Sequence, residues 1–220
     1  MEARAVKTVR LLGPLTKSEH KHVGPTLWVE GEVALAEAPA RVAVVGSREA
    51  SDLGLRRAAK AASALAGAGV VIVSGLARGI DVAAHRACLA VGGRTLAVIA
   101  TPIDRCYPPE HAQLQRVLAR EQLVVSPFEP GHATEKADFV RRNRVMALFV
   151  HASIVVEAGD GSGTKSHALE LLRLGKPLFI MRSQLERSDV RWPRQAIERG
   201  AIVLDGVDQV LAMLALPPSE

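Results

Sequence analysis

The stretch VAVVGSR (Val42–Arg48) decides the fold, because a fully apolar run passes directly into a glycine turn. The same pattern returns where Val70–Val73 precedes SGLARGID (Ser74–Asp81), and where Ile154–Glu157 precedes GSGT (Gly161–Thr164). Continuous apolar runs of this length are typical of parallel strands that are buried on both faces. Small residues after each run let backbone N–H groups and the N-terminus of the following helix approach an anion. Three such loops in one chain predict a concave site for a phosphorylated ligand.

Around these loops, short β-branched runs alternate with alanine- and leucine-rich segments of helical period. This alternation predicts an α/β fold with a doubly wound, mostly parallel sheet. In such sheets a ligand lies beyond the carboxyl ends of the strands, which is where the three loops fall. We expect strands at 42–45, 70–74, 95–100, 123–126, 154–157, 177–181 and 201–204, and helices at 54–68, 80–91, 109–120, 138–150, 164–174, 191–199 and 207–214.

The first 26 residues are polar and basic and are interrupted by Gly13, Pro14, Gly24 and Pro25. Glycine and proline at this density predict a flexible or loosely packed N-terminal arm over residues 1–26. Its cations either add contacts to a nucleic-acid backbone or form a solubilising tail. The rest of the 220-residue chain is predicted to form one domain over 27–216 and a frayed tail over 217–220.

The composition argues against several classes of protein. No apolar run reaches the length of a membrane span, and Met1–Leu15 lacks the apolar core of a signal peptide. Cys88 and Cys106 imply no disulfide framework, so a reducing cytoplasm is the expected location. The histidines and cysteines show no metal-ligand spacing, and neither a metal nor a cofactor is predicted. A net charge of +5 is compatible with nucleic acid, but with 3% aromatic residues any base stacking depends on few side chains.

Charged residues beside two of the loops have a functional and a structural interpretation. Arg48 is predicted to open a helix, where the dipole repels a cation unless an anion is bound, so we favour a phosphate contact. Asp81 and His85 fall on one face of the next predicted helix. We favour a capping role for Asp81 over general-base catalysis, because no nucleophile or ligand set accompanies it.

A cationic segment surrounds one aromatic residue, with Lys136, Phe139 and RRNR (Arg141–Arg144) close together. In one interpretation the cations follow a single-stranded backbone while Phe139 stacks on a base. In the other, Phe139 belongs to the core and the arginines form a solvated helix face. This segment alone does not separate the two.

The glycine-rich loop GDGSGTK (Gly159–Lys165) resembles a phosphate cradle but is neither a Walker A sequence nor a nucleophile elbow. Ser162 has no evident His–Asp pair, so a hydrolase triad is not predicted.

Together these blocks resemble the DprA/Smf family of DNA-processing proteins. The resemblance implies an extended Rossmann-like domain that binds single-stranded DNA, forms a homodimer and helps to load RecA recombinase during natural transformation, without catalysis. It rests on blocks that occur in order between about Leu27 and Leu214: Val42–Arg48, Ser74–Asp81 with Ala84-His85, Tyr107-Pro108, Phe139 ahead of Arg142-Asn143-Arg144, and Val155–Ala158 with Ser162-Gly163.

The residues and the resemblance together give a set of predicted DNA contacts, in which Phe139 is the base-contacting aromatic and no residue is catalytic. The predicted nucleic-acid-binding residues are Ser47, Arg48, Gly75, Ala77, Arg78, Gly79, Lys136, Phe139, Arg142, Asn143, Arg144, Gly161, Ser162, Gly163, Thr164 and Lys165.

The chain also departs from the family pattern. We expect a minimal member, without the family's N-terminal helical domain and C-terminal winged-helix domain. Ser162–His167 replaces the usual SGSLITA, and Arg182-Ser183 replaces the usual Pro-Gly.

Two other functions stay open. The fold is shared with LOG-type nucleoside-monophosphate phosphoribohydrolases, whose GGxGTxxE motif would overlay Gly161–His167. The glutamate position then holds His167, and the missing carboxylate places this enzyme second. The third interpretation is a sensor that binds a small nucleotide in the same pocket.

Overall fold

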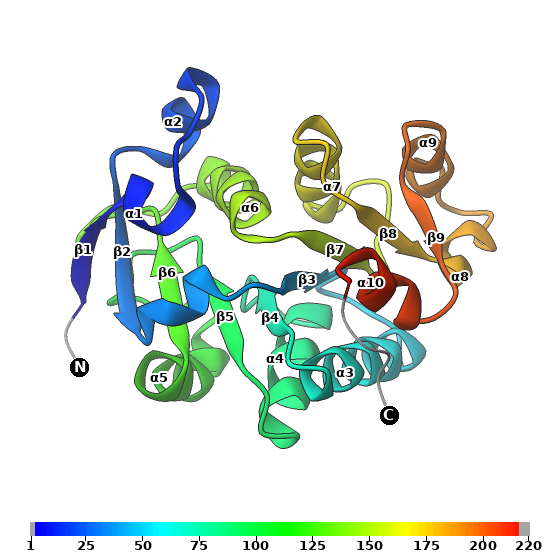
Figure 1. The fold of residues 1–220 in the computed structure, drawn as a ribbon, viewed down its shortest axis with the longest axis horizontal. Coiled ribbons are helices and arrows are strands. Elements are labelled where there is room, and N and C mark those ends of the chain that lie inside the picture. Colours follow the sequence, from blue (N-terminus) through cyan, green and yellow to red (C-terminus); the bar gives the residue numbers. More distant parts are fainter. Residues whose placement is uncertain (1–2, 216–220) are drawn as a thin grey trace.

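One sheet of nine strands organises the computed structural model, which describes residues 3–215 (Figure 1). The strand order is β1-β2-β6-β5-β4-β3-β7-β8-β9. Strands β3 to β9 run parallel to one another, whereas β1 pairs antiparallel with β2, and β2 with β6. The predicted mostly parallel α/β sheet is therefore confirmed. The strands are β1 Arg4–Lys7, β2 Thr26–Gly31, β3 Arg41–Val45, β4 Val71–Ser74, β5 Thr95–Val98, β6 Leu123–Ser126, β7 Ala152–Val155, β8 Leu178–Met181 and β9 Ile202–Leu204.

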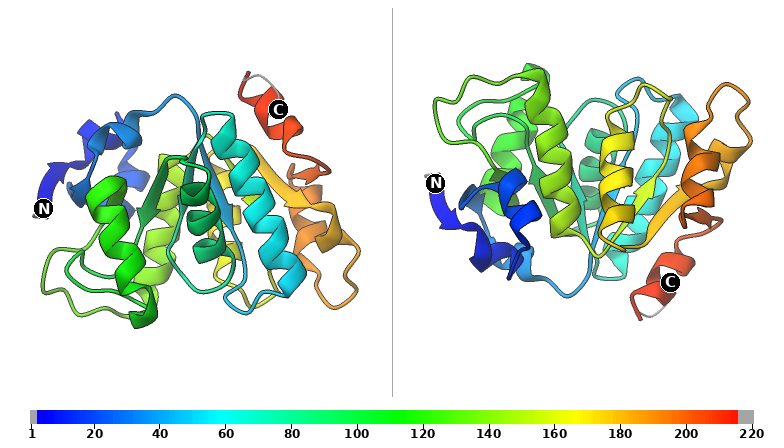
Figure 2. Two further views of the ribbon diagram at one scale, coloured as in Figure 1. Left: turned by 90° about the horizontal axis from the view of Figure 1, so that it is seen from below. Right: turned by 90° about the horizontal axis from the view of Figure 1, so that it is seen from above.

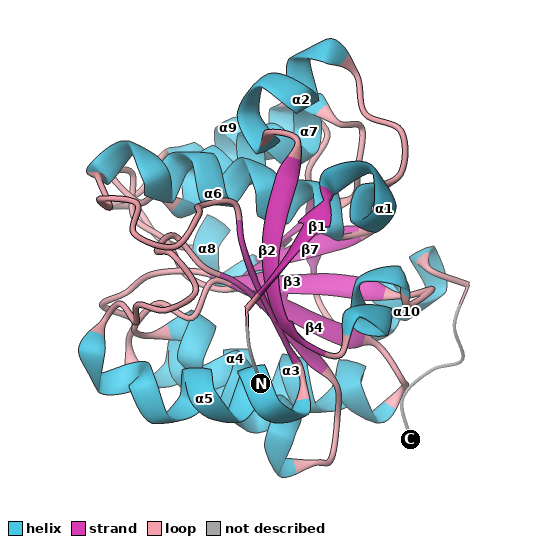
Figure 3. Ribbon diagram, turned by 90° about the vertical axis from the view of Figure 1, so that its left-hand side faces the viewer, coloured by secondary structure: helices cyan, strands magenta, loops and turns pink. Residues whose placement is uncertain are grey.

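Helices cover both faces of this sheet (Figure 3). The two views of Figure 2 show α3, α4 and α5 across one face, and α6, α7 and α9 across the other. These helices are α3 Asp52–Gly67, α4 Ile80–Ala90, α5 Ala112–Glu121, α6 Lys136–Phe149, α7 Thr164–Arg173 and α9 Trp192–Glu198. The shorter elements are α1 Thr8–Leu12, α2 Lys17–Val23, α8 Arg182–Leu185, α10 Asp208–Met213 and two 3₁₀ turns, η1 Val33–Glu37 and η2 Pro109–His111.

The apolar strands build a core on each face. Val42 and Val44 of β3 pack with residues of α3 and α4, whereas Ala43 and Val45 pack with residues of α6 and α7. Successive strand residues point to opposite faces, so a strand buried on both sides must be apolar throughout. This requirement explains why Val42–Val45 is apolar without interruption.

The centre of the sheet sets the position of the site. β3 lies between β4 and β7, and the chain crosses from one side of β3 to the other. The loops that follow these three strands therefore meet at the carboxyl edge of the sheet, at its topological switch point.

The prediction of a flexible N-terminal arm is wrong for the residues that the structure describes. β1 and β2 extend the sheet beside β6, and Leu11 and Val23 are buried in the main core. The side-chain hydroxyl of Thr16 accepts the N–H of Glu19, whose carboxylate accepts the N–H of Thr16, so a capping box starts α2. A Thr-x-x-Glu spacing is the sequence signature of such a box and outweighs the glycines and prolines around it.

Element ends differ from the prediction by a few residues. α3 begins at Asp52, two residues earlier than predicted, and Arg48 lies in the loop before it and does not open a helix. α6 begins at Lys136, two residues earlier than predicted. The tail predicted over 217–220 lies outside the described residues. Within 3–215, no helix combines the length and the apolar character needed to cross a membrane.

Candidate nucleic-acid interface

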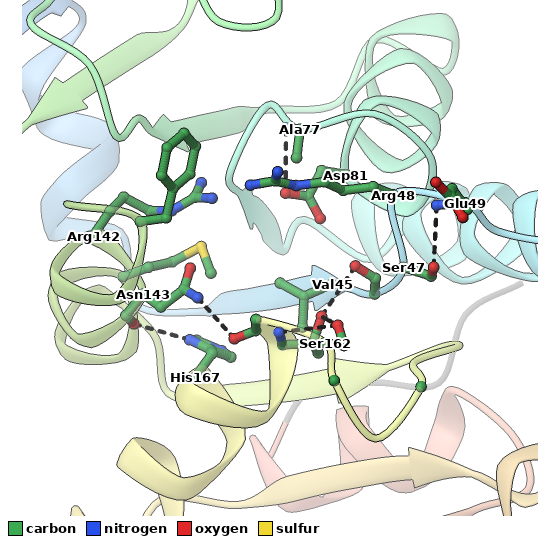
Figure 4. A pocket seen from close by; sticks show the side chains of 17 residues that line it. Val45, Ser47, Arg48, Glu49, Ala77, Asp81, Arg142, Asn143, Ser162 and His167 are labelled. Atoms are coloured by element: carbon green, nitrogen blue, oxygen red, sulfur yellow. Dashed lines mark hydrogen bonds between the residues drawn. The ribbon is translucent and has the colours of Figure 1, made fainter. Parts of the chain in front are cut away.

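Two adjoining cavities open where β3, β4 and β7 end. The larger, of about 500 Å³, lies between the loop after β3, the loop after β7 and the inner side of α6 (Figure 4). The smaller, of about 220 Å³, lies between the loop after β4, the segment 100–108 and α6. Both cavities share five lining residues: Arg48, Glu49, Ala77, Phe139 and Arg142.

An arginine stacked on an aromatic ring forms the shared wall. The guanidinium carbon of exposed Arg48 lies 4.9 Å from the centroid of the Phe139 ring. The ring of Tyr107 meets Phe139 edge-on, with centroids 5.5 Å apart, and Tyr107 is 52% exposed. Phe139 is half-buried rather than part of the core clusters, so the structure favours the interpretation that leaves its ring accessible. Sequence reasoning used Tyr107 as a family marker and did not place it in the site.

The loop after β3 is fixed by its backbone. The N–H of Ser47 donates to the carbonyl of Glu157 at 2.6 Å, and the N–H of Glu49 donates to the Ser47 hydroxyl at 3.1 Å. The prediction that Arg48 opens a helix is wrong, because Ser51 caps α3 by accepting the N–H of Gly54 at 3.0 Å. The helix-dipole argument for a phosphate contact at Arg48 therefore no longer applies. The support for that contact is instead that the guanidinium of Arg48 is exposed beside a cavity.

The loop after β4 is closed by a buried carboxylate. Asp81 is 6% exposed and accepts the N–H groups of Gly75 at 3.1 Å and Ala77 at 3.4 Å. Burial raises the pKa of Asp81, and the positive charge of Arg142 opposes that rise. Asp81 therefore fixes the loop from the wall of the larger cavity, and the predicted capping role is wrong, because α4 has no side-chain cap hydrogen bond. Gly79 starts α4 at φ 73° and packs on the carbonyl of Ser47.

Two of the predicted arginines already form interactions within the protein. Arg142 is 5% exposed and donates to the carbonyl of Val98 at 2.8 Å, so it lines both cavities mainly as a support beneath them. Arg78 is exposed on the smaller cavity and forms an ion pair with Glu110. Glu110 and the rim residue Glu49 are acidic neighbours that the sequence patterns did not bring into the site.

Two buried histidines are neutral supports. His167 is 1% exposed, with Nε2 2.8 Å from the Ser153 hydroxyl and Nδ1 3.1 Å from the Asn143 carbonyl. Burial lowers the pKa of His167 to about 4 and that of His85 to about 3. His85 lies 2.7 Å from the Thr95 hydroxyl, so Asp81 does not orient it. With both nitrogens of His167 occupied, the position that carries the glutamate of a phosphoribohydrolase offers no acid or base.

The loop after β7 carries Ser162 and Thr164, which face each other. The Ser162 hydroxyl donates to the Thr164 hydroxyl at 3.0 Å, and that hydroxyl donates to the Gly46 carbonyl at 3.0 Å. These bonds tie the loop to β3. Gly161 and Gly163 are exposed on the cavity wall.

Three predicted basic residues line neither of the two cavities. Lys136 is exposed at the first residue of α6, and Arg144 is half-buried on the same helix. Lys165 lines a separate small cleft with Trp192 and Arg199.

Within residues 3–215, no group of three or more His, Cys, Asp or Glu side chains is placed to hold a metal ion. Cys88 and Cys106 are free thiols, and burial raises the pKa of Cys88 to about 12.

Comparison with known proteins gives the chain its family. The family model for DNA recombination-mediator protein A matches residues 14–215. Protein Smf of Synechocystis sp. is 37% identical over 177 residues, which are 80% of this chain and 44% of the relative. The curated relatives are longer, and the matched part of this chain spans 44% to 65% of their length.

Two solved structures share the whole fold. DNA processing protein A (DprA) of Streptococcus pneumoniae superposes with a TM-score of 0.84 at 30% identity, covering 96% of this chain and 74% of that chain. DNA processing protein A of Helicobacter pylori, whose structure is reported for its single-stranded DNA binding mode, gives a TM-score of 0.80 at 25% identity and covers 97% and 96%. Since the family model spans nearly all of the chain and the named relatives are Smf and DprA, the protein belongs to the DprA/Smf family of DNA recombination-mediator proteins.

Proposed function

We propose that this chain binds single-stranded DNA at the paired cavities beside Arg48 and Phe139. The observation that carries the proposal is an exposed guanidinium stacked on an aromatic ring at the shared wall of both cavities. A guanidinium binds phosphate through paired N–H donors, and an aromatic ring stacks on any base. The Helicobacter pylori relative, similar over the whole chain, is itself described as binding single-stranded DNA.

The shape of the site supports a single strand over a duplex. The larger cavity, of about 500 Å³, is of a size for one small-molecule-sized group such as an unstacked base. A base enters such a cavity only after leaving its stack, which costs least in a strand that has no partner. Lys136, exposed at the first residue of α6, is proposed to meet the backbone as it approaches.

Further parts of the proposal rest on the family alone. We propose a non-catalytic role in which a homodimer of this chain, in the cytoplasm, presents bound DNA to a RecA recombinase. Light scattering of the purified protein tests the dimer, and RecA filament assembly on protein-coated single strands tests the transfer.

The binding itself is tested by fluorescence anisotropy of a labelled oligothymidine at two salt concentrations, beside a duplex of equal length. We expect tighter binding of the single strand and a negative slope of log affinity against log salt. Arg48→Ala should weaken binding, whereas Arg56→Ala, an exposed arginine of α3 outside both cavities, should not. Equal affinity for both DNA forms, or equal loss in both variants, would overturn the proposal.

A further inference from the structure

The side-chain amide of Asn143 has a fixed direction in the larger cavity. Asn143 lies on α6, is 7% exposed and lines the cavity wall. Its Nδ2 donates to the Gly163 carbonyl at 2.9 Å and to the Ser166 hydroxyl oxygen at 3.0 Å. Figure 4 shows the amide nitrogen turned to the loop after β7 and the amide oxygen turned away from that loop.

The hydrogen bonds around the amide determine which end is which. The Ser166 hydroxyl donates its own proton to the Gly163 carbonyl at 2.6 Å, so its oxygen is free to accept from Asn143. Turning the amide over would place Oδ1 against the Gly163 carbonyl, and two acceptors repel each other. Both N–H donors of Asn143 are therefore committed, and Oδ1 faces the cavity as an acceptor only.

Oδ1 has no donor within the described residues, whereas several neighbouring polar groups of the cavity wall are paired with one another. The nitrogens of His167 are occupied by Ser153 and by the Asn143 carbonyl. Ser162 and Thr164 bond each other. Oδ1 is in contact with the open space of the cavity, so it can accept an N–H from an incoming group.

We propose that Asn143 Oδ1 accepts the ring N–H that thymine and guanine carry on their pairing edge. This inference rests on the proposed function, because it assumes that a base of the strand enters the larger cavity. The N3–H of thymine or the N1–H of guanine donates to Oδ1, and the carbonyl beside it accepts from Arg48 at the shared wall. Cytosine and adenine carry a lone pair on the equivalent ring nitrogen and can reach Oδ1 only through their exocyclic amino group, so the proposed contact is one to a ring N–H and not a choice among the four bases.

The test modifies the ligand rather than the fold. Affinity is measured for labelled oligomers of thymidine and of N3-methylthymidine, of the same length and at one salt concentration. Methylation at N3 removes the donor and leaves the stacking face and the phosphates in place. We expect the thymidine oligomer to bind about tenfold more tightly than the N3-methylthymidine oligomer, as for one hydrogen bond lost.

A variant ties the effect to the residue. In Asn143→Ala the affinity ratio of thymidine to N3-methylthymidine should fall to about one. If Asn143 only supports the loop, the variant weakens binding of both oligomers equally and keeps the ratio, which would overturn the inference. Equal binding of the thymidine and N3-methylthymidine oligomers by the wild type would also overturn it while leaving single-strand binding intact. Binding of neither would instead remove the proposed function.

Discussion

The loop after β4 and the loop after β7 both present glycines to the site, and their surroundings differ. A Cβ atom on Gly75 would lie 1.7 Å from an Arg142 nitrogen, and one on Gly79 would lie 2.2 Å from the Ser47 carbonyl oxygen. A Cβ on Gly159 or Gly161 would meet nothing within 4 Å. The first loop needs glycine so that the framework can close around it, whereas the second has space on its cavity side. The same glycine-rich pattern therefore allows close packing in the loop after β4 and leaves space beside the cavity in the loop after β7.

The largest effect expected from this comparison is on folding. Gly79→Ala combines a backbone at φ 73° with a side chain forced onto two carbonyls, and we expect a loss of about 3 kcal/mol or more in the free energy of unfolding. Gly161→Ala should change that free energy by less than about 0.5 kcal/mol. Urea denaturation of both variants measures the difference. Equal destabilisation would show that the closely packed loop after β4 and the loop after β7, called the open loop, do not differ in this way.

The free energy of unfolding should depend on pH through His167, which lies beneath the open loop. His167 has a folded pKa of about 4, below the usual 6.5, so the fold favours its neutral form. Stability from this group is complete above pH 6.5 and is lost as the pH falls toward 4, at up to about 1.4 kcal/mol per pH unit. His167→Gln keeps a donor and an acceptor but cannot titrate. The unfolding free energy of wild type minus variant should therefore decline between pH 6.5 and 4, and a constant difference would contradict the prediction.

The two arginines of the shared wall extend the comparison from loops to side chains. Arg48→Ala removes an exposed cation, and we expect binding to weaken by about 2 kcal/mol while the unfolding free energy stays unchanged. Arg142→Leu removes the donor to Val98 and the charge beside Asp81, so its main effect should be on stability. Anisotropy and urea denaturation on both variants separate the roles. If Arg142→Leu folds normally and loses only binding, the buried arginine belongs with the ligand contacts.

How far the sequence predicts this site depends on the range of the interactions involved. The β3 strand and the glycine turn after it follow from local pattern, since a strand buried on both faces has to be apolar. Local pattern does not predict that Arg48 is exposed and Arg142 buried, because the burial of Arg142 depends on the carbonyl of Val98 in β5, which is distant in sequence. The orientation of the Asn143 amide also depends on a residue distant in sequence, since its partner Gly163 lies 20 residues away. The folded N-terminus is the opposite case, because its capping box was readable locally at Thr16 and Glu19.

Phe139 tests whether the accessible ring contributes independently of charge. Phe139→Leu keeps an apolar side chain but removes the stacking face, and we expect a loss of about 1–2 kcal/mol in binding. The slope of log affinity against log salt should not change, because no phosphate contact is lost. Tyr107→Leu serves as the comparison, since its ring touches Phe139 only by an edge and should matter less. A changed salt slope in Phe139→Leu would show that its main role is to hold Arg48.

The smallest effect is expected at Lys165, which adjoins the open loop in sequence but lines neither cavity. Its cleft contains Trp192 and Arg199. The N–H groups of Trp192 and Arg191 lower the pKa of Asp160, which accepts the former at 3.0 Å, and the charge of Lys165 adds a smaller contribution. Lys165→Ala should therefore weaken binding by less than about 0.5 kcal/mol, the range of a distant, solvent-screened charge. Anisotropy at low salt, where such a charge counts most, gives the strictest measurement. A loss as large as that of Arg48→Ala would mean that the strand continues past the open loop toward α9, and that the bound DNA covers more of the protein than the two cavities.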